Sequence, residues 1–464
     1  MLRTAFIILS GNAAASLLLL IRNLVVARMI PVADYGIAST FAMVMAIVEM
    51  SSALGLQQQI IQSKDGDDPR FQAALQGFQV LRGCMSGLIL FVTAGVMARF
   101  LGIPEVAWAY QVLALVPVLN ALVHFDIHRI NRHMRFWPML LSGIIPALLS
   151  LLLVWPFAYW FGNWQVMLWA IIAQAALTVL VSHVLAERPY RLVWDRTVMA
   201  GSLRFGWPLL VNAGLMFLVF QGDKLIVGRT MGMTELAIFS MGTTLTLTPT
   251  LVLAKSAQNL FLPRLSRAVG TPQFTLTAQQ ALQTISLSVL GFILATLLVG
   301  GPVLNLLVGP KYADLFPLLI WFALGQALRV NKAGPAIVSL ALGYTSNAMF
   351  ANLARVLSLF FAAIVALRGG GMLDILTIAL AGEALGLLIS IALMLRVSSL
   401  PRILVIVQQG AVGMFILMAA AWALYQPPGH GFAPWPIWLA SLAIFLTAIF
   451  LMPETLRKFR FIKI

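Results

Sequence analysis

Charge and cysteine are both scarce in this sequence of 464 residues. Charged residues make up 10% of the chain and hydrophobic residues 61%, whereas a soluble domain carries roughly 25% charged residues. This composition excludes an ordinary soluble enzyme or a soluble nucleic-acid-binding protein. The only cysteine, Cys84, also excludes an intrachain disulfide and a metal site built from several cysteines.

Long apolar runs are what the sequence has in abundance. A helix needs about 20 apolar residues to cross a hydrocarbon core of roughly 30 Å, and such runs recur from end to end. We expect an all-α polytopic membrane protein in which every connection is too short to fold as a separate catalytic domain. The fourteen expected transmembrane helices cover residues 5–27, 35–57, 76–99, 107–124, 138–161, 164–186, 206–228, 235–256, 280–308, 315–341, 350–367, 373–395, 403–424 and 435–452.

Basic residues outnumber acidic ones by 30 to 15, which in a soluble protein would suggest a nucleic-acid partner. In a membrane protein, cytoplasmic loops collect Lys and Arg. If successive loops lie on alternate sides of the membrane, eighteen basic residues fall on one side. The opposite side holds five, Arg28, Arg99, Arg229, Lys311 and Arg368. We therefore expect no nucleic-acid partner and both termini in the cytoplasm. The first apolar run resembles a signal peptide but continues past a buried arginine, which favours a retained helix.

Two stretches of the chain resemble one another at a constant offset of 201 residues. "IRNLVVARMIPVADYGIAS" (21–39) aligns with "GDKLIVGRTMGMTELAIFS" (222–240). Six expected spans separate the copies, so both run in the same direction. This pattern predicts two parallel six-helix bundles related by a pseudo-two-fold axis along the membrane normal, followed by two further helices. The expected domains are residues 1–190, 191–396 and 397–464.

The stretch "FQGDKLIVGRTMGMTELAIFSMG" (220–242) resembles the seventh-helix signature of bacterial polysaccharide-exporter flippases. These belong to the multidrug/oligosaccharidyl-lipid/polysaccharide superfamily. Three more stretches sit where that family has similar ones: "VVARMIPVADYGIAS", "LFLPRLSR" and "GPKYADLFPLLIWFALGQAL". The resemblance implies a flippase for undecaprenyl-diphosphate-linked glycans in a bacterial inner membrane. It implies membrane lipids, a glycan polymerase and glycosyltransferases as partners, and it leaves the glycan unidentified.

Ionisable residues inside the expected spans are the candidate site residues. A central Arg, Lys or Asp costs about 2.5–3.5 kcal/mol on insertion scales, so most of them should face a cavity or a partner. Three helix faces combine cations, which suit a diphosphate, with amides or hydroxyls, which suit a sugar. The candidates for substrate binding on these faces are Arg82, Gln79, Gln326, Arg329, Lys332, Asn352 and Arg355, together with Lys224 on the seventh span. For Arg82 and Arg355 the alternative is snorkelling to lipid headgroups.

Three acidic residues also lie within expected spans. A buried carboxylate can take up a proton or Na⁺ and couple transport to a gradient, which makes Glu49 and Glu383 candidates for ion coupling. Each stands alone on an apolar helix, so a structural hydrogen bond to a neighbouring helix is the alternative. Asp223 aligns with Arg22 in the repeat, and we expect the two to form a gating pair. A static ion pair within one bundle is the alternative there.

Two other functions stay open from the sequence. A multidrug or cation extruder is disfavoured because the intramembrane residues are mostly cationic. A membrane glycan polymerase or glycosyltransferase would need a large extracytoplasmic loop, and the expected loops are short. We therefore expect a transporter that works by alternating access, without enzymatic activity, metal or organic cofactor. The pair His124 and His128 is assigned to an interfacial turn or short amphipathic helix rather than to a metal site.

Overall fold

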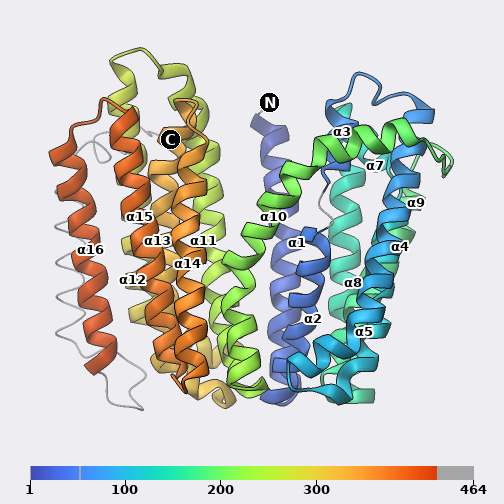
Figure 1. The fold of residues 1–464 in the computed structure, drawn as a ribbon, viewed down its shortest axis with the longest axis horizontal. Coiled ribbons are helices and arrows are strands. Elements are labelled where there is room, and N and C mark those ends of the chain that lie inside the picture. The colour runs from blue at the N-terminus through green and yellow to red at the C-terminus, as the bar shows by residue number, and fades with distance from the viewer. Residues whose placement is uncertain (1, 52–53, 426–464) are drawn as a thin grey trace. The chain divides into compact units, whose positions relative to one another are not determined.

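The computed structural model describes residues 2–51 and 54–425, and helices account for most of them (Figure 1). Packing divides the chain into two compact units, Met1–Ala237 and Ile238–Ile464, called unit 1 and unit 2 below. Unit 1 contains α1 (Leu2–Met29), α2 (Val32–Ser51), α3 (Leu56–Gln62), α4 (Pro69–Phe100), η1 (Pro104–Val106), α5 (Ala107–Leu113), α6 (Leu115–Ala121), α7 (Asp126–Arg132), α8 (Trp137–Phe161), α9 (Gln165–Val184) and α10 (Arg196–Thr230). After α11 (Met233–Ala268), unit 2 contains α12 (Gln273–Val308), η2 (Pro310–Leu315), α13 (Phe316–Ala341), α14 (Ser346–Leu367), α15 (Met372–Val397) and α16 (Arg402–Tyr425).

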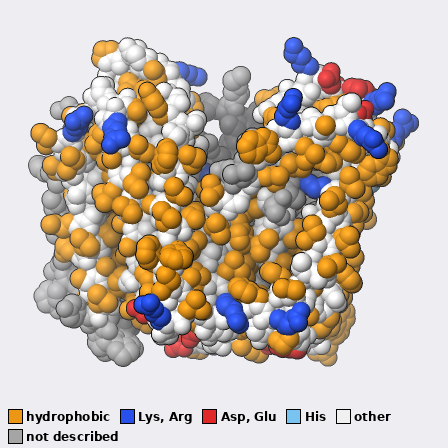
Figure 2. Space-filling view, in the orientation of Figure 1, with side chains coloured by type: hydrophobic (Ala, Val, Ile, Leu, Met, Phe, Trp, Pro, Cys, Tyr) orange, Lys and Arg blue, Asp and Glu red, His pale blue; other side chains and the backbone are white. Residues whose placement is uncertain are grey.

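The apolar character of these helices agrees with a membrane protein. Among the described residues, ten helices are long and apolar enough to cross a membrane, or eleven if the bent pair Pro104–Ala121 and Asp126–Arg132 forms one span. Figure 2 shows hydrophobic side chains over the sides of the helices and Lys and Arg mostly near helix ends. The expected all-helical, multi-pass architecture is thus confirmed. The count of fourteen spans stays a prediction, and the last expected span, 435–452, lies outside the described residues.

The repeat read from the sequence has a structural counterpart in the helix boundaries. α1 ends at Met29 and α10 ends at Thr230, while the following helices begin at Val32 and Met233. Both pairs of boundaries therefore obey the 201-residue offset. The break contains Pro31 in the first copy and Gly232, with φ 93°, in the second. Pro cannot continue a helix, and Gly accepts the positive φ that often follows one. The two-fold relation of the bundles and the boundaries at 190 and 396 stay predictions.

Side-chain capping sets the starts of α4 and α10 in unit 1. α4 begins after Asp68, whose carboxylate accepts two backbone N–H groups at 3.1 and 3.3 Å. α10 begins after Asp195, which accepts the backbone N–H of Thr197 at 2.9 Å. A helix start leaves its first N–H groups without intrahelical partners, and these carboxylates satisfy them. The caps thereby fix where the polar face of α4 begins.

The basic segment with two histidines forms the short helix α7, as expected, and several of its side chains are buried in unit 1. His124 and His128 are only 3% and 6% exposed. Asp126, fully buried, accepts the Arg129 Nε at 2.6 Å and the backbone N–H of Glu187 at 2.8 Å. A buried carboxylate needs such partners, and they tie the helix to the segment that follows α9. The position of this helix at a membrane interface stays a prediction.

In unit 2, α13 packs against α12, α15 and α16, and α14 packs against α15 (Figure 1). A buried polar triangle joins three of these helices. Asn331 donates to the Oε1 of Gln409 at 2.7 Å and accepts from Ser286 at 3.2 Å, while Gln409 donates to Ser286 at 3.3 Å. Satisfied buried networks fix relative orientation. The triangle thus sets which face of α13 points toward α14 and α15.

Candidate functional site

A cluster of charged side chains lies between α13, α14 and α15 in unit 2. At its centre is Glu383, whose Oε1 accepts from the Nε and a terminal nitrogen of Arg329 at 2.9 and 2.7 Å. The Oε2 of Glu383 accepts from Lys332 Nζ at 2.9 Å. The Nε of Arg355 lies 3.5 Å from Oε1. The stripes predicted on two separate helices therefore meet around one carboxylate, which we call the Glu383 cluster.

The neutral residues of the same stripes complete this cluster. Lys332 also donates to the Oδ1 of Asn352 at 2.9 Å, and Arg329 donates to the Oε1 of Gln326 at 3.3 Å. Arg355 donates to a hydroxyl one turn along α14 at 2.8 Å. Every predicted binding residue on α13 and α14 thus takes part in one connected network.

Burial separates the members of the cluster. The side chains of Glu383 and Arg355 are 2% and 1% exposed, that of Lys332 is 8% exposed, and that of Arg329 is 18% exposed. The alternative that Arg355 snorkels to headgroups is therefore wrong. The four ionisable groups carry a formal charge of +2. Buried like charges need compensation, so this arrangement favours the approach of a further anion from the side of Arg329.

Glu383 has its charged partners on neighbouring helices. The sequence shows it on an apolar helix, and its partners come from two other helices. The structural alternative, contact with neighbouring helices, is the one observed. Both carboxylate oxygens face cations, and a proton or Na⁺ would compete with three resident positive charges. Ion coupling at this residue stays a prediction without support from its geometry.

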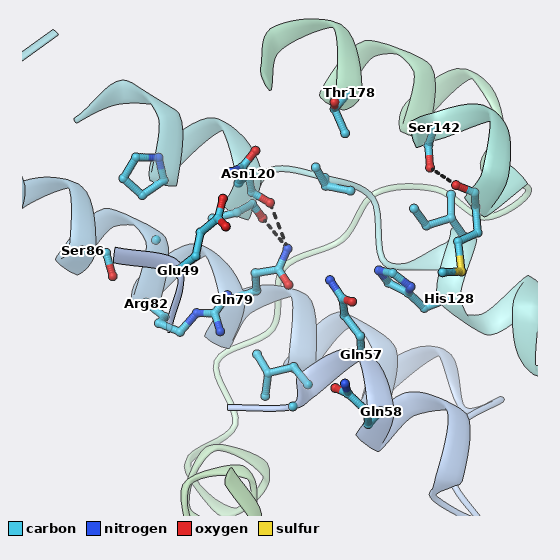
Figure 3. A pocket seen from close by; sticks show the side chains of 18 of the residues that line it. Glu49, Gln57, Gln58, Gln79, Arg82, Ser86, Asn120, His128, Ser142 and Thr178 are labelled. Carbon is cyan, nitrogen blue, oxygen red and sulfur yellow. Dashed lines mark hydrogen bonds between the residues drawn. The ribbon is translucent and has the colours of Figure 1, made fainter. Parts of the chain in front are cut away.

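Unit 1 contains a cavity of about 710 Å³ (Figure 3). Its wall is built from α2, α3, α4, α6, α7, α8 and α9. The predicted residues Gln79 and Arg82 line it, and so does Ser86 one turn further along α4. Gln76, one turn before Gln79, instead donates to the backbone oxygens of Ala121 and Val123 and serves the packing of α4.

The wall of this cavity mixes apolar residues with polar groups that carry almost no net charge. The polar side chains labelled in Figure 3 are Glu49, Gln57, Gln58, Gln79, Arg82, Ser86, Asn120, His128, Ser142 and Thr178. One acid and one arginine offset each other, and the remaining groups are mainly amides and hydroxyls. Gln79 uses its Nε2 on the backbone oxygens of Asn120 and Ala121, at 3.3 and 3.2 Å. Its orientation is thereby fixed.

The predicted gating residue Arg22 is buried in unit 1. It donates to the Oγ of Ser150 at 3.0 Å and to the Oε1 of Gln174. These partners lie on α8 and α9, so the guanidinium is anchored by neutral groups of its own unit. Asp223 and Lys224 lie on α10, and both are half-buried. The gating pair stays a prediction.

Sequence reasoning missed two kinds of residue. It did not connect Glu383 with the cations, although two basic stripes with no acid of their own call for a carboxylate on a neighbouring helix. It also missed Gln57, Gln58 and Asn120. The first two lie on α3, seven residues long, within what the sequence presents as the end of a span and a loop. No periodic signal distinguishes them. Among the described residues, no group of three potential ligands suits a metal ion.

Comparisons with known proteins agree with this architecture. A chain described as "Lipid II flippase MurJ, inward closed conformation" has a TM-score of 0.70 at 15% identity, covering 98% of this chain and 100% of that one. An inward-facing multidrug resistance MATE family transporter of the MOP superfamily has a TM-score of 0.64 at 16% identity, covering 88% and 96%. At these identities the similarity shows the fold alone, which this chain shares with both of those proteins.

Sequence comparisons narrow the assignment. The succinoglycan biosynthesis transport protein ExoT of Rhizobium meliloti (strain 1021) is 22% identical over 321 residues, which are 66% of this chain. The alignment spans 62% of that protein's length. A family model described as "Polysaccharide biosynthesis protein" matches residues 25–317, well over half of the chain. The predicted resemblance to polysaccharide exporters is therefore confirmed, and the chain belongs to the polysaccharide biosynthesis protein family.

Proposed function

We propose that this protein moves an undecaprenyl-diphosphate-linked oligosaccharide from the cytoplasmic to the periplasmic leaflet of a bacterial inner membrane, for surface polysaccharide assembly. Both termini lie in the cytoplasm, and fourteen spans form two six-helix bundles and a C-terminal pair. The family membership and the fold support transport of a lipid-linked glycan. A glycan polymerase and glycosyltransferases would act after and before this step.

The observation that carries this proposal is the Glu383 cluster. A diphosphate carries several negative charges, and Arg forks onto phosphate oxygens while Lys supplies a point charge. Arg329, the most exposed member, is placed to meet the diphosphate first. Lys332 and Arg355 lie behind it, each close to Glu383. The diphosphate and Glu383 would thus bind the same cations, which the structure already holds around the carboxylate.

The transport cycle follows from that shared use of cations. With no substrate, Glu383 compensates part of the positive charge of its neighbours. When the diphosphate binds Arg329, the ion pair between Arg329 and Glu383 weakens, because both anions compete for one guanidinium. Alternating access needs a ligand that binds the two conformations differently. The competition supplies such a difference. The bound diphosphate stabilises most the conformation in which it has better access to Arg329.

A multidrug extruder is the second candidate, because a MATE transporter shares the fold. The cluster argues against it. A cationic drug that approaches a cluster of formal charge +2 would be repelled. This repulsion is stronger at a buried site than in water. A glycan polymerase or glycosyltransferase is third, and we favour transport over catalysis because the polar residues form binding networks.

Transfer in proteoliposomes tests the proposal. We expect purified protein to move fluorescent undecaprenyl-diphosphate oligosaccharide, prepared from the lipid-linked pool of the native cells, into the opposite leaflet. Arg329→Ala should abolish transfer, because the first phosphate contact is lost, and Arg329→Lys should keep part of it.

The Arg329→Ala variant should still fold, since Lys332 and Arg355 continue to compensate Glu383. Arg368→Ala, which removes an exposed arginine of the same unit, is the matched control and should be unaffected. Full transfer by Arg329→Ala would refute the assignment.

A further inference from the structure

The cavity of unit 1 has a chemistry that the Glu383 cluster lacks. Its volume of about 710 Å³ lies within the range of roughly 300–1,000 Å³ typical of pockets for small ligands. All of its described lining residues belong to unit 1. The cavity therefore exists independently of unit 2 and of any site there.

Amides are the most numerous polar groups of the wall. Gln57 and Gln58 come from α3, Gln79 from α4 and Asn120 from the end of α6. An amide has two donors and an acceptor oxygen, although the Nε2 of Gln79 already donates to the α6 backbone. A sugar ring presents neighbouring hydroxyls, each both donor and acceptor, so a planar amide can engage two of them at once. Serine and threonine hydroxyls elsewhere on the wall extend the same chemistry (Figure 3).

Charge at the wall is compatible with a neutral ligand. Arg82 and Glu49 both line the cavity and offset one another in formal charge. A diphosphate would meet an acid and only one strong cation here, and burying an anion without enough compensation is costly. An uncharged polyhydroxylated ligand needs only replacement of its hydrogen bonds to water.

The mouth of the cavity is accessible. Gln57 and Gln58 are exposed, whereas Gln79 is 5% exposed and is oriented by its bonds to the α6 backbone. A ligand can thus enter past two solvated amides and meet a fixed amide deeper in. The described lining residues include no Phe, Tyr or Trp for a sugar ring to stack on. Weak binding follows, which suits a protein that must release what it carries.

We propose that this cavity binds the uncharged glycan portion of the substrate, separately from the site for the diphosphate. The inference rests on the proposed function and adds to it the location of sugar recognition. It moves Arg82 from the diphosphate to the sugar and keeps Gln79 as a residue that binds sugar. Gln57, Gln58 and Asn120 become binding residues, and the choice of glycan is made inside unit 1.

The test uses an oligosaccharide that has neither lipid nor phosphate. It is released by mild acid from the native lipid-linked pool, dephosphorylated and titrated against the full-length protein in lipid nanodiscs. Saturation-transfer NMR suits weak binding. We expect saturable binding by the wild type. The double variant Gln57→Ala/Gln58→Ala should bind about tenfold more weakly, the effect of losing two ordinary hydrogen bonds. Asn120→Ala should weaken binding less.

The control is Gln62→Ala, which removes an exposed amide of the same helix that does not line the cavity. It should leave the affinity unchanged. Equal binding by the double variant and the wild type, or no binding of the oligosaccharide by the wild type, would overturn the inference. Transfer of the intact lipid-linked substrate is measured on the same preparation. If transfer proceeds while the oligosaccharide does not bind, only the sugar site is wrong. If the wild type transfers nothing, the proposed function fails.

Discussion

The Glu383 cluster of unit 2 and the cavity of unit 1 differ in how many charged groups they contain. In unit 2, one carboxylate and three cations are buried together and hold one another in position. In unit 1, the polar groups of the cavity wall are mainly amides and hydroxyls set among apolar residues, and its acid Glu49 stays exposed. A buried charge cluster is expensive to maintain, so its presence in one unit indicates a charged ligand there. A neutral wall indicates a ligand whose recognition depends on hydrogen-bond geometry. Under the proposed function, this difference would assign the two chemical parts of a lipid-linked glycan to different units.

The largest expected effect comes from removing the shared counter-ion. Glu383→Gln leaves three buried cations without their carboxylate, and breaking a buried ion pair costs about 3–5 kcal/mol. We expect a large drop in the melting temperature of the detergent-solubilised protein, or loss of folded protein. Glu49→Gln, at the exposed acid of unit 1, should change the melting temperature little. Similar melting of both variants would remove the contrast between the two regions.

The next largest effect concerns the repeat. Arg22 is anchored by Ser150 and Gln174, and the repeat aligns it with Asp223. If the two act as a gating pair, Arg22→Asp and Asp223→Arg should each strongly reduce transfer, because each places like charges on the two sides. The double variant should regain much of the activity in proteoliposomes. A double variant no better than either single one would show that the aligned charges act separately.

A smaller effect is expected at the mouth of the cavity. Gln57→Ala/Gln58→Ala removes two exposed side chains, and exposed substitutions usually change stability by no more than about 0.5 kcal/mol. The melting temperature should stay at the wild-type value while transfer slows. A clear drop in melting temperature would instead make these amides structural, and the contrast with the Glu383 cluster would weaken.

The smallest effect lies in the loops of unit 1. Hydrogen bonds from Arg135 and Arg129 hold the pKa of Glu187 below its usual range, and the contact with His133 lowers the pKa of Asp67. A carboxylate with a lowered pKa in the folded state stabilises the protein above its unfolded pKa of about 4. That contribution is lost as the pH falls through the folded value. Stability should therefore be level from pH 7 to about 5 and decline below.

Glu187→Gln is the variant for this pH dependence. It should flatten the decline slightly and change the melting temperature at neutral pH very little, because exposed ion pairs contribute little. Thermal unfolding followed from pH 7 to pH 4 measures both. A large loss of stability at pH 7 would mean that the loop contacts matter as much as the buried cluster.

Much of the fold follows from composition and periodicity. Apolar runs mark the helices, and the observed boundaries of two helix pairs obey the 201-residue offset, although the expected spans miss each boundary by two or three residues. The spacing of Gln326, Arg329 and Lys332 gives their common face, because residues three apart on a helix are neighbours. These predictions need only local geometry.

The rest depends on tertiary contacts that have no local signal. The sequence shows Glu383 as an isolated acid, because its partners lie 28 to 54 residues away on other helices. Likewise, the sequence around His128 does not show that this side chain is buried within unit 1. Gln57 and Gln58 join the cavity because a short helix, α3, returns toward α7. Packing between helices decides each of these cases.

The most direct measurement of the division between charge and sugar recognition is inhibition of transfer by soluble inorganic diphosphate. The inhibition constant is compared among wild type, Arg329→Lys and Gln57→Ala/Gln58→Ala in the same proteoliposomes. We expect Arg329→Lys to raise the constant about tenfold, because the bidentate fork is lost, and the glutamine variant to keep the wild-type value while its transfer is slower. An unchanged constant in Arg329→Lys, or an equal rise in the glutamine variant, would contradict the assignment of the diphosphate to the Glu383 cluster.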